Sequence, residues 1–272
     1  MTRLYAIDCN GLGHYLWHSK TRMDDHGNEI SLEDATRRWW ALFMAQMGPT
    51  HAVACFDAPD NWRYKVHVEY KSNRKIKPVD PDKAAALKSL PACWDALGVP
   101  VVAAHGFEAD DVIASIANRH ASESVEVVIV ATDKDLMQLV GDHVKQYDPK
   151  PNKANECVFY DAHAVEQKLK VPPHRVTELL ALMGDGADHI PGVEGWGETR
   201  AVNAIRQTHS SREIFRLAEK GALDSILPKL QAFLVAHRDD YELSFKLASL
   251  RYDVPVAESV EAYRVTGLRD AA

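Results

Sequence analysis

The sequence has few cysteines, and their spacing argues against both a disulfide framework and a zinc knuckle. Its four cysteines, Cys9, Cys55, Cys93 and Cys157, are scattered over 272 residues and form no Cys-x-x-Cys pair. A disulfide framework or a zinc knuckle needs cysteines that are more numerous or more closely spaced. We therefore expect reduced thiols. Hydrophobic residues make up 46% of the chain, enough for a substantial core.

Long apolar runs are also absent. The opening residues, Met1 to Asp8, contain no apolar core of a signal peptide. No stretch approaches the roughly 20 apolar residues that are needed to cross a bilayer as a helix. These absences predict an intracellular, cytoplasmic protein with no membrane partner.

Several common catalytic signatures are missing as well. The sequence has no Gly-x-Ser-x-Gly elbow and no Walker loop, so acyl transfer and nucleoside-triphosphate hydrolysis have no support. An aspartyl-phosphate phosphatase would need a second Asp two residues after Asp8, and Asn10 occupies that position.

Positive charge is scarce overall but is concentrated in one segment. The net charge of −7 argues against a nucleic-acid partner, because phosphate backbones are usually met by basic surfaces. Between residues 62 and 77, however, only one acid, Glu69, stands against six basic residues: Arg63, Lys65, Lys71, Arg74, Lys75 and Lys77. Trp62, Tyr64 and Tyr70 lie among them, and aromatic rings can stack on unpaired bases. A solvated basic loop is the alternative, but the aromatic residues favour a nucleic-acid contact.

Carboxylates follow several apolar runs that are typical of buried strands. Residues 3–7 lead into Asp8, 52–56 into Asp57 and 126–132 into Asp133. In an open α/β sheet such strands are parallel, and their carboxyl ends line one crevice where ligands bind. We therefore expect acids from distant parts of the sequence to meet at one edge. The full set is Asp8, Asp57, Glu108, Asp110, Asp111, Asp133, Asp135, Asp185 and Asp188.

Carboxylates that crowd together repel one another unless cations neutralise them. Oxygen ligands favour Mg²⁺ or Mn²⁺ over zinc, and two such ions suit phosphodiester hydrolysis. The alternative is that each acid caps a helix or complements its dipole. The clusters at 108–111 and 133–135 contain more acids than capping needs, so the joint pattern favours a metal site.

The chain divides into an alternating part and a helical part. Alternation of strand and helix up to about Asp161 predicts a doubly wound α/β domain, with one helix that the Ser31–Asp34 capping box opens and that stops near Gly48, and others at 82–97 and 108–121. Later helices are expected near 161–169, 174–184, 198–206, 211–219, 222–237 and 239–250. The polar segment between Asp57 and Asp82 is too long for an ordinary connection, which predicts a functional loop or a helical arch.

A glycine-rich stretch follows the predicted helix that ends at Gly184. Asp185 and Asp188 come first, and then Gly192, Gly195 and Gly197 lead into a helix near Glu198. Closely spaced glycines let backbone N–H groups approach an anion, and a helix N-terminus is itself a phosphate site. Such a hairpin can hold a DNA backbone without reading bases. Taken alone, three glycines before a helix also fit a tight turn.

Six stretches together resemble the 5′-nuclease family of flap endonucleases, bacteriophage 5′-exonucleases and the 5′-nuclease domain of bacterial family A DNA polymerases. They are residues 5–10, 56–57, 69–74, 106–112, 131–136 and 180–201, in the family's order. The resemblance implies an α/β fold, PIN-like, with a mostly parallel central sheet flanked by helices. It implies a catalytic domain over 1–165 with an arch at about 58–82, and a helical DNA-binding region over 166–272 with a helix–three-turn–helix at about 184–206.

The resemblance also implies roles for individual residues. The first metal ion would be held by Asp8, Asp57, Glu108, Asp110 and Asp111. The second ion would be held more loosely by Asp133, Asp135, Asp185 and Asp188. Mg²⁺ would be the natural ion and Mn²⁺ a substitute. Lys71 and Arg74 would contact the scissile phosphate, and Tyr70 would stack a base.

Further nucleic-acid contacts are expected from Arg63 and Lys75, which belong to the basic segment but lie outside the matching stretches. In the hairpin the expected contacts are Gly192, Gly195, Gly197, Thr199 and Arg200, and the resemblance implies that backbone carbonyls there also bind K⁺. Three residues depart from the family's pattern: Cys9 replaces a glycine, His189 an asparagine and Trp196 a small aliphatic residue. Thr199-Arg200 replaces the usual Lys-Thr, which puts the side-chain phosphate contact in question.

The resulting expectation is a monomeric, Mg²⁺-dependent, structure-specific 5′ nuclease acting on branched or 5′-ended DNA. It acts as both a 5′-3′ exonuclease and a flap endonuclease, and a phage replication enzyme is favoured over a free-standing bacterial one. Two alternatives remain open. One is a ribonuclease that removes RNA primers from RNA–DNA hybrids, because nothing in the sequence reads the 2′-hydroxyl. The other is an inactive DNA-junction binder, although such a protein would gain nothing from nine mutually repelling acids.

Overall fold

The computed structural model describes residues 1–24, 26–75, 80–152 and 156–266. Two compact units make up the chain. The first, here called the sheet unit, comprises Met1–Asn61, Pro78–Asp161 and Arg251–Ala272; the second, the helical unit, comprises Trp62–Lys77 and Ala162–Leu250. The sequence-based division at residues 165 and 166 stays a prediction.

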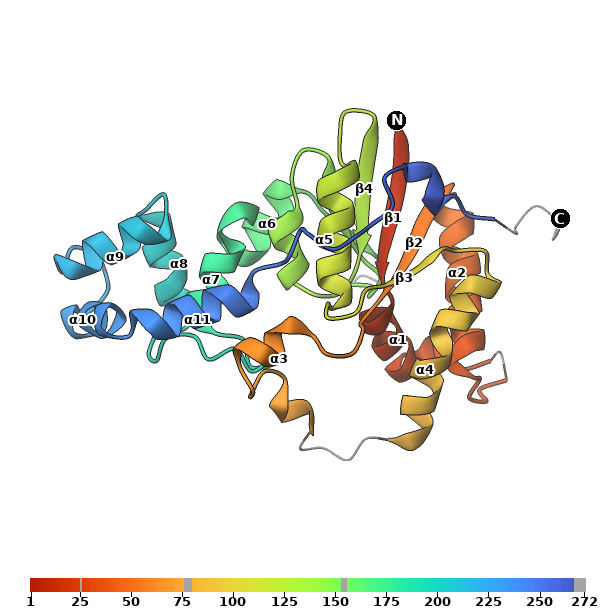
Figure 1. Cartoon of the computed structure of the whole chain (residues 1–272), viewed down its shortest axis with the longest axis horizontal. Helices are drawn as coiled ribbons and strands as arrows, with labels where there is room; N and C mark the ends of the chain where they lie inside the picture. The colour runs from red at the N-terminus through yellow and green to blue at the C-terminus, as the bar shows by residue number, and fades with distance from the viewer. Residues whose placement is uncertain (25, 76–79, 153–155, 267–272) are drawn as a thin grey trace. The chain divides into compact units, whose positions relative to one another are not determined.

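The sheet unit is built on six strands in the order β3-β2-β1-β4-β5-β6. Figure 1 labels the first four of them in chain order, β1 to β4. They are β1 (Thr2–Asp8), β2 (His51–Phe56), β3 (Val101–Ala103), β4 (Val125–Val130), β5 (Val144–Asp148) and β6 (Val158–Tyr160). All neighbours pair in parallel except β5 and β6. Every residue of β2 is buried, as expected for a parallel strand with both faces covered. The predicted mostly parallel α/β sheet is confirmed.

The strand order reverses beside β1. The chain first builds outward from β1 through β2 to β3, and then returns to the other side of β1 with β4 and β5. Diverging connections at such a point leave a crevice at the carboxyl ends of the two central strands, where α/β proteins bind ligands. β1 ends at Asp8, and Asp133 follows β4 by three residues.

Four helices belong to the sheet unit: α1 (Cys9–His18), α2 (Leu32–Met47), α4 (Pro81–Ala96) and α5 (Ala109–His120). α2 begins after the Ser31 cap and ends at Gly48 in the left-handed conformation, close to the predicted bounds. Trp40 of α2 and Trp94 of α4 meet edge to face, with ring centroids 5.4 Å apart, in the core that covers one side of the sheet. α5 packs against β1, β2 and β4. The sequence did not predict α1.

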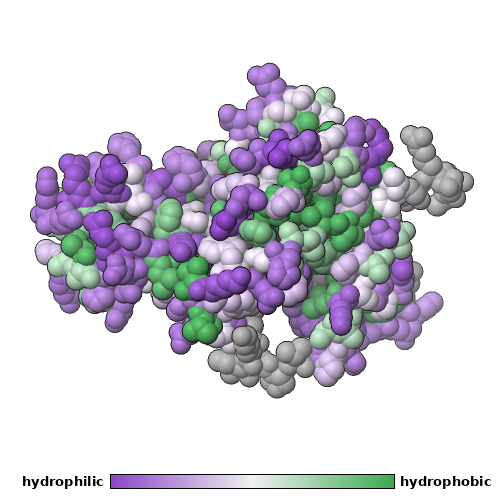
Figure 2. Space-filling view, viewed as in Figure 1, coloured by the Kyte–Doolittle hydropathy of each residue, from purple (hydrophilic) through white to green (hydrophobic). Residues whose placement is uncertain are grey.

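The helical unit contains α3 (Trp62–Val66), α6 (Ala162–Leu169), α7 (Val176–Met183), α8 (Glu198–Arg206), α9 (Ser211–Glu219), α10 (Pro228–Ala236) and α11 (Arg238–Ala248). α8 and α9 have their predicted bounds. α10 begins at residue 228, not 222, because a proline fits only the first turn of a helix. Hydrophilic side chains cover most of α9 and α10 on the face drawn in Figure 2.

Short 3-10 helices occur at Lys20–Arg22, Ser72–Lys75, Asp135–Leu139, Pro173–Arg175 and Val260–Tyr263. Residues 251–266 pack within the sheet unit, and no element is predicted from the sequence for the last twenty residues of the chain. The contacts of residues 251–266 include Val265 N–H to the carbonyl of Thr50 at 3.0 Å and Thr266 N–H to that of Gly98 at 2.8 Å. No helix within the described residues is both long and apolar enough to cross a membrane.

Candidate metal centre and nucleic-acid interface

Asp8 and Asp57 lie at the carboxyl ends of two neighbouring strands. Asp8 is the last residue of β1 and pairs in register with Cys55 of β2, two residues before Asp57. The side-chain oxygen of Asn10 accepts the N–H of Asp57 at 2.9 Å, which ties the two strand ends together. Asp57 Oδ1 in turn accepts the N–H of Ala109 at 2.9 Å, so the start of α5 lies against the same edge.

The Asp8 carboxylate also caps a helix. Its Oδ1 accepts the N–H of Gly11 at 2.9 Å, and α1 starts at the next residue, Cys9. Capping was the alternative to metal binding in the sequence, and here it is present. It does not exclude the metal role, because an ionised carboxylate has about four acceptor positions on its two oxygens.

At the start of α5 the predicted ligands are partly committed to the backbone. Glu108 is the N-cap and forms a reciprocal capping box with Asp111. Asp111 is fully buried, and Oδ1 accepts the N–H of Arg251 at 2.9 Å. Asp110 is partly buried. Asp111 therefore stabilises the first turn of α5 from a buried position. That Asp111 binds a metal ion directly stays a prediction.

The turn after β4 carries Asp133 and Asp135. Asp133 Oδ1 accepts the N–H of Asp135 at 2.8 Å, which begins a 3-10 helix. Gln146 of β5 is fully buried and donates from Nε2 to the carbonyls of Ala131, at 3.0 Å, and Asp133, at 2.7 Å. The sequence did not single out Gln146, whose side chain fixes the turn from the neighbouring strand.

The donors at this edge are carboxylate oxygens. Cys9 and Cys55 lie beside them, but burial raises the pKa of both thiols well above the ordinary value, so they stay protonated at neutral pH. Hard oxygen donors fit Mg²⁺ or Mn²⁺ better than zinc. As the side chains stand, no group of three or more His, Cys, Asp or Glu within the described parts of the chain is arranged to hold a metal ion.

In the helical unit, Asp185 and Asp188 occupy the loop after α7. Asp185 Oδ1 accepts the N–H of Ala187 at 2.6 Å. Asp188 Oδ2 accepts the hydroxyl of Tyr70 at 3.1 Å and lies 3.4 Å from Nζ of Lys71. Lys71 is buried, and its ammonium is paired with a predicted metal ligand.

Two predicted nucleic-acid contacts are corrected by burial. The Tyr70 side chain is 2% exposed, so its ring cannot stack on a base in this conformation. Arg63 is equally buried, and its guanidinium donates to the carbonyls of Leu247 at 2.8 Å and Ser249 at 3.1 Å. Arg63 thus joins α3 to the end of α11. The backbones of Arg74 and Lys75 belong to the 3-10 helix Ser72–Lys75, but their predicted contacts depend on side chains outside the described parts of the structure.

The glycine hairpin is exposed at its tip and buried at its base. Gly192 is buried and donates its N–H to Ser244 Oγ at 2.9 Å, so this amide holds the fold and not a phosphate. Gly195, with φ +80°, and Gly197, the N-cap of α8, are exposed, as are Thr199 and Arg200.

Two side chains fix the tip. Arg200 Nη1 donates to the carbonyl of Gly195 at 2.7 Å, which is one of the oxygens available to the predicted K⁺. Trp196, which replaces a small aliphatic residue, is buried and donates from Nε1 to the carbonyl of Leu230 at 3.2 Å.

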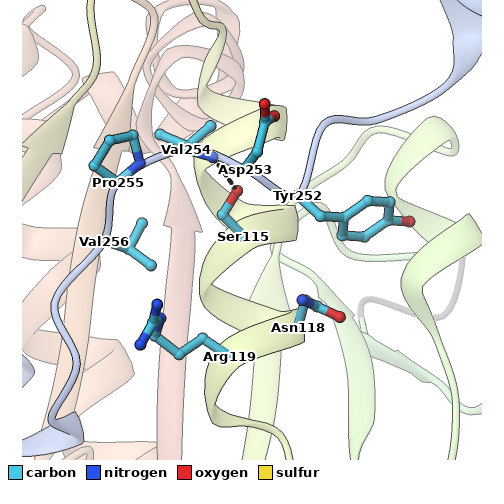
Figure 3. Close-up of a pocket in the computed structure, with 8 residues that line it drawn as sticks. All are labelled: Ser115, Asn118, Arg119, Tyr252, Asp253, Val254, Pro255 and Val256. Carbon is cyan, nitrogen blue, oxygen red and sulfur yellow. Dashed lines mark hydrogen bonds between the residues drawn. The ribbon is translucent and has the colours of Figure 1, made fainter.

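The sheet unit also has a pocket of about 300 Å³ along α5 and residues 252–256 (Figure 3). It is lined by Ser115, Asn118, Arg119, Tyr252, Asp253, Val254, Pro255 and Val256. None of the predicted metal ligands lines it. The one carboxylate among its lining residues is that of Asp253, whose Oδ1 accepts a hydrogen bond from Nε of Arg251 at 2.8 Å. The pocket therefore does not offer the group of carboxylates that lies at the edge of the sheet.

Family models match the chain almost from end to end. The model of the 5′-3′ exonuclease N-terminal resolvase-like domain matches residues 3–170, and that of the 5′-3′ exonuclease C-terminal SAM fold matches residues 171–271. The chain belongs to the 5′-3′ exonuclease family. This confirms the resemblance seen in the sequence and the expectation of a nuclease.

Curated relatives in this family carry related names. A 5′-3′ exonuclease of Aquifex aeolicus is 34% identical over 221 residues, which cover 80% of this chain and 70% of the relative. Flap endonuclease Xni of Shewanella amazonensis is 30% identical over 266 residues, covering 97% of this chain and 99% of the relative. DNA polymerase I of Bacillus caldotenax is 34% identical over 220 residues, and the match spans 24% of that longer protein.

Solved structures with the same fold include an exonuclease and the catalytic core of a DNA-bound protein. T5 5′-exonuclease with bound zinc superposes with a TM-score of 0.73 at 20% identity, covering 90% of this chain and 89% of that one. The catalytic core of Rad2 in complex with DNA substrate gives a TM-score of 0.60 at 16% identity, covering 95% and 80%. At these identities the likeness establishes the fold alone.

Proposed function

We propose that the chain is a Mg²⁺-dependent, structure-specific 5′ nuclease that hydrolyses phosphodiesters of branched or 5′-ended DNA with two metal ions. The observation that carries the proposal is the placement of Asp8, Asp57 and Asp133 at the carboxyl ends of β1, β2 and β4, around the point where the strand order reverses. In a member of this nuclease family, a crevice lined by carboxylates at this point suits metal-assisted hydrolysis. Such a reaction needs no side chain as the nucleophile.

The predicted ligand sets are kept in this proposal. Asp8, Asp57, Glu108, Asp110 and Asp111 would hold one ion, and Asp133, Asp135, Asp185 and Asp188 the other. When bound, such ions lower the pKa of water and neutralise charge on the phosphate oxygens. Asp111 already accepts backbone N–H groups, so besides its role as a ligand we assign it the role of orienting Glu108 and Asp110 through the first turn of α5.

Other residues of the chain prepare the carboxylates for this role. Asn10 fixes the Asp57 backbone, and Gln146 fixes the turn that carries Asp133. Partners of this kind hold metal ligands in their productive orientation, and their loss typically lowers metal affinity or activity about 10- to 100-fold. Both are hydrogen-bonded to the backbone of the ligand, so neither competes for the carboxylate oxygens.

The nucleic acid would be gripped mainly by backbone groups. The exposed N–H groups at Gly195, Gly197 and the start of α8 suit a phosphate, because a helix N-terminus carries partial positive charge. Contacts of this kind position a duplex without reading its sequence. The Lys71 ammonium, which lies 3.4 Å from Asp188 Oδ2, is proposed to stabilise charge on the scissile phosphate. K⁺ at the hairpin carbonyls and a monomeric state belong to the same proposal.

One assay tests the proposal. A 5′-labelled flap, a nicked duplex, single-stranded DNA and an RNA–DNA hybrid are each incubated with the enzyme in Mg²⁺, in Mn²⁺ and in chelator. We expect cleavage of the flap and of 5′-ended duplex with either ion, and none in chelator. Cleavage of the hybrid alone would establish the primer-removing ribonuclease instead, and flap binding without any cleavage would establish the junction binder. Cleavage that persists in chelator would refute the metal mechanism.

A further inference from the structure

Two short segments of the helical unit are joined by side chains other than Lys71. They are residues 69–73 and residues 186–189 in the loop after α7. Asn73 donates from Nδ2 to the carbonyl of Gly186 at 2.6 Å. His189 Nδ1 lies 2.8 Å from the carbonyl of Glu69 and 2.6 Å from the hydroxyl of Ser72. A carbonyl oxygen only accepts, so Nδ1 carries the proton in this arrangement.

The backbone at the centre of this junction is strained in both segments. Lys71 has φ +53° and His189 has φ +55°. Residues with side chains rarely adopt this left-handed conformation, and it persists only where surrounding contacts determine it. The hydrogen bonds of Asn73 and His189 reach across from one strained segment to the other, and supply such contacts.

The strained conformation determines where the Lys71 ammonium lies. The N–H of Lys71 donates to the carbonyl of Asp188 at 2.9 Å, and its Nζ lies 3.4 Å from Oδ2 of the same residue. The backbone N–H and the side-chain ammonium of Lys71 therefore both lie against Asp188. A flexible lysine would ordinarily sample many rotamers, and restricting it in advance removes that entropic cost from the reaction.

We propose that Asn73 and His189 are positioning residues that hold Lys71 in register with Asp188. This inference rests on the proposed function, in which the Lys71 ammonium stabilises charge on the phosphate. Asn73 bonds to the backbone of the loop and His189 to the backbone of the Lys71 segment, so the two form a clamp from opposite sides. Asn73 is uncharged, and its removal alters position without altering the electrostatic attraction of DNA.

The test compares Asn73→Ala, His189→Ala, His189→Asn and Lys71→Ala with the wild type. Three quantities are measured: the single-turnover rate of flap cleavage in Mg²⁺, flap affinity in Ca²⁺, and backbone hydrogen exchange of a peptide covering residues 69–73 in the free enzyme. Asn118→Ala is the matched control, because Asn118 is an exposed asparagine on α5 in the sheet unit.

We expect Asn73→Ala and His189→Ala to slow cleavage by roughly tenfold to a hundredfold, the range that small misplacements of a catalytic group produce, with flap affinity nearly unchanged. Exchange at residues 69–73 should become faster. His189→Asn should restore most of the rate, since asparagine tolerates a left-handed backbone and still offers an N–H to Glu69. In the Lys71→Ala background neither alanine change should slow cleavage further, because both act through Lys71.

The outcomes separate this inference from the proposed function. Normal cleavage by Lys71→Ala would remove the catalytic role of Lys71, whatever the clamp does. Slow cleavage by Lys71→Ala with normal cleavage by both Asn73→Ala and His189→Ala would refute the clamp alone. Fully additive losses in the double variants would refute it as well. If an alanine variant fails to fold, His189→Asn and the hydrogen-exchange measurement on it decide between rescue and refutation.

Discussion

Gly11 lies so close to the Asp8 carboxylate that no side chain fits between them: a Cβ on Gly11 would lie 2.1 Å from Asp8 Oδ2. The same carboxylate accepts the Gly11 N–H at 2.9 Å. The absence of a side chain at residue 11 therefore allows one carboxylate to cap α1 and to face the carboxyl edge of the sheet. This relationship couples a helix start to the proposed metal centre.

Gly11→Ala should displace the Asp8 carboxylate and weaken metal binding. We expect the Mg²⁺ concentration at half-maximal single-turnover cleavage to rise by roughly tenfold or more, as for loss of other supports of a metal ligand. The measurement is a Mg²⁺ titration with flap substrate. Gly141→Ala is the control, because a Cβ there would meet nothing within 4 Å among the described residues. An unchanged Mg²⁺ midpoint in Gly11→Ala would show that Asp8 is not a ligand.

Asp133→Asn and Asp185→Asn should each abolish hydrolysis or slow it strongly, while flap binding in Ca²⁺ stays nearly intact. The amide oxygen of asparagine can still accept the N–H of Asp135 or of Ala187, so the local turn is preserved while a negative charge is lost. Relief of charge repulsion should keep the melting temperature in chelator at or above that of the wild type. Asp142→Asn, at an exposed position, is the control for loss of one charge. Wild-type turnover in either variant would contradict the ligand assignment.

The parts of the fold that were predictable are those with a local signal. Buried parallel strands appear in the sequence as apolar runs, so the strand ends before Asp57 and Asp133 were evident. α1 was not, because Asn10, Gly11 and Gly13 are poor helix formers, and its start depends on Asp8.

The site residues that were missed or misassigned depend on contacts far along the sequence. Gln146 reaches back to Asp133, and Asn10 to Asp57. Arg63 is buried against a carbonyl 184 residues away, so this one member of the basic and aromatic segment joins α3 to the end of α11. The pattern of charges in a sequence shows neither which group a charged side chain pairs with nor how deeply that side chain is buried.

Two variants of the glycine hairpin should distinguish phosphate binding by backbone groups from phosphate binding by the Arg200 side chain. Arg200 is bonded to Gly195, so we expect Arg200→Ala to leave the salt dependence of duplex binding unchanged. Gly197→Val should weaken binding, because its side chain would cover the N–H groups at the start of α8. A Cβ at Gly197 meets nothing within 4 Å in the described structure, so the change introduces no clash at that atom. The measurement is the dissociation constant across a range of salt concentrations. A slope reduced by about one unit in Arg200→Ala would instead assign a phosphate contact to that side chain.

The stability of the fold should depend on pH through the carboxyl group of Glu126. Glu126 is buried on β4, which by itself raises the pKa of its carboxyl, but hydrogen bonds from Lys145 and Arg3, at 2.8 and 2.7 Å, outweigh burial and bring the pKa below the ordinary 4.5. A carboxyl with a lowered folded-state pKa stabilises the fold above its unfolded-state pKa, and that contribution is lost as pH falls through the folded-state value. Glu126→Gln should therefore be less stable than the wild type at pH 7, and the difference should shrink as pH falls below about 4.5. Urea unfolding at several pH values measures this difference in stability. Glu123→Gln is the control, because Glu123 is exposed and lies two residues before β4. A stability difference that stays constant down to pH 3, roughly a unit or more below the ordinary pKa of a glutamate, would mean that Glu126 contributes by packing and not by charge.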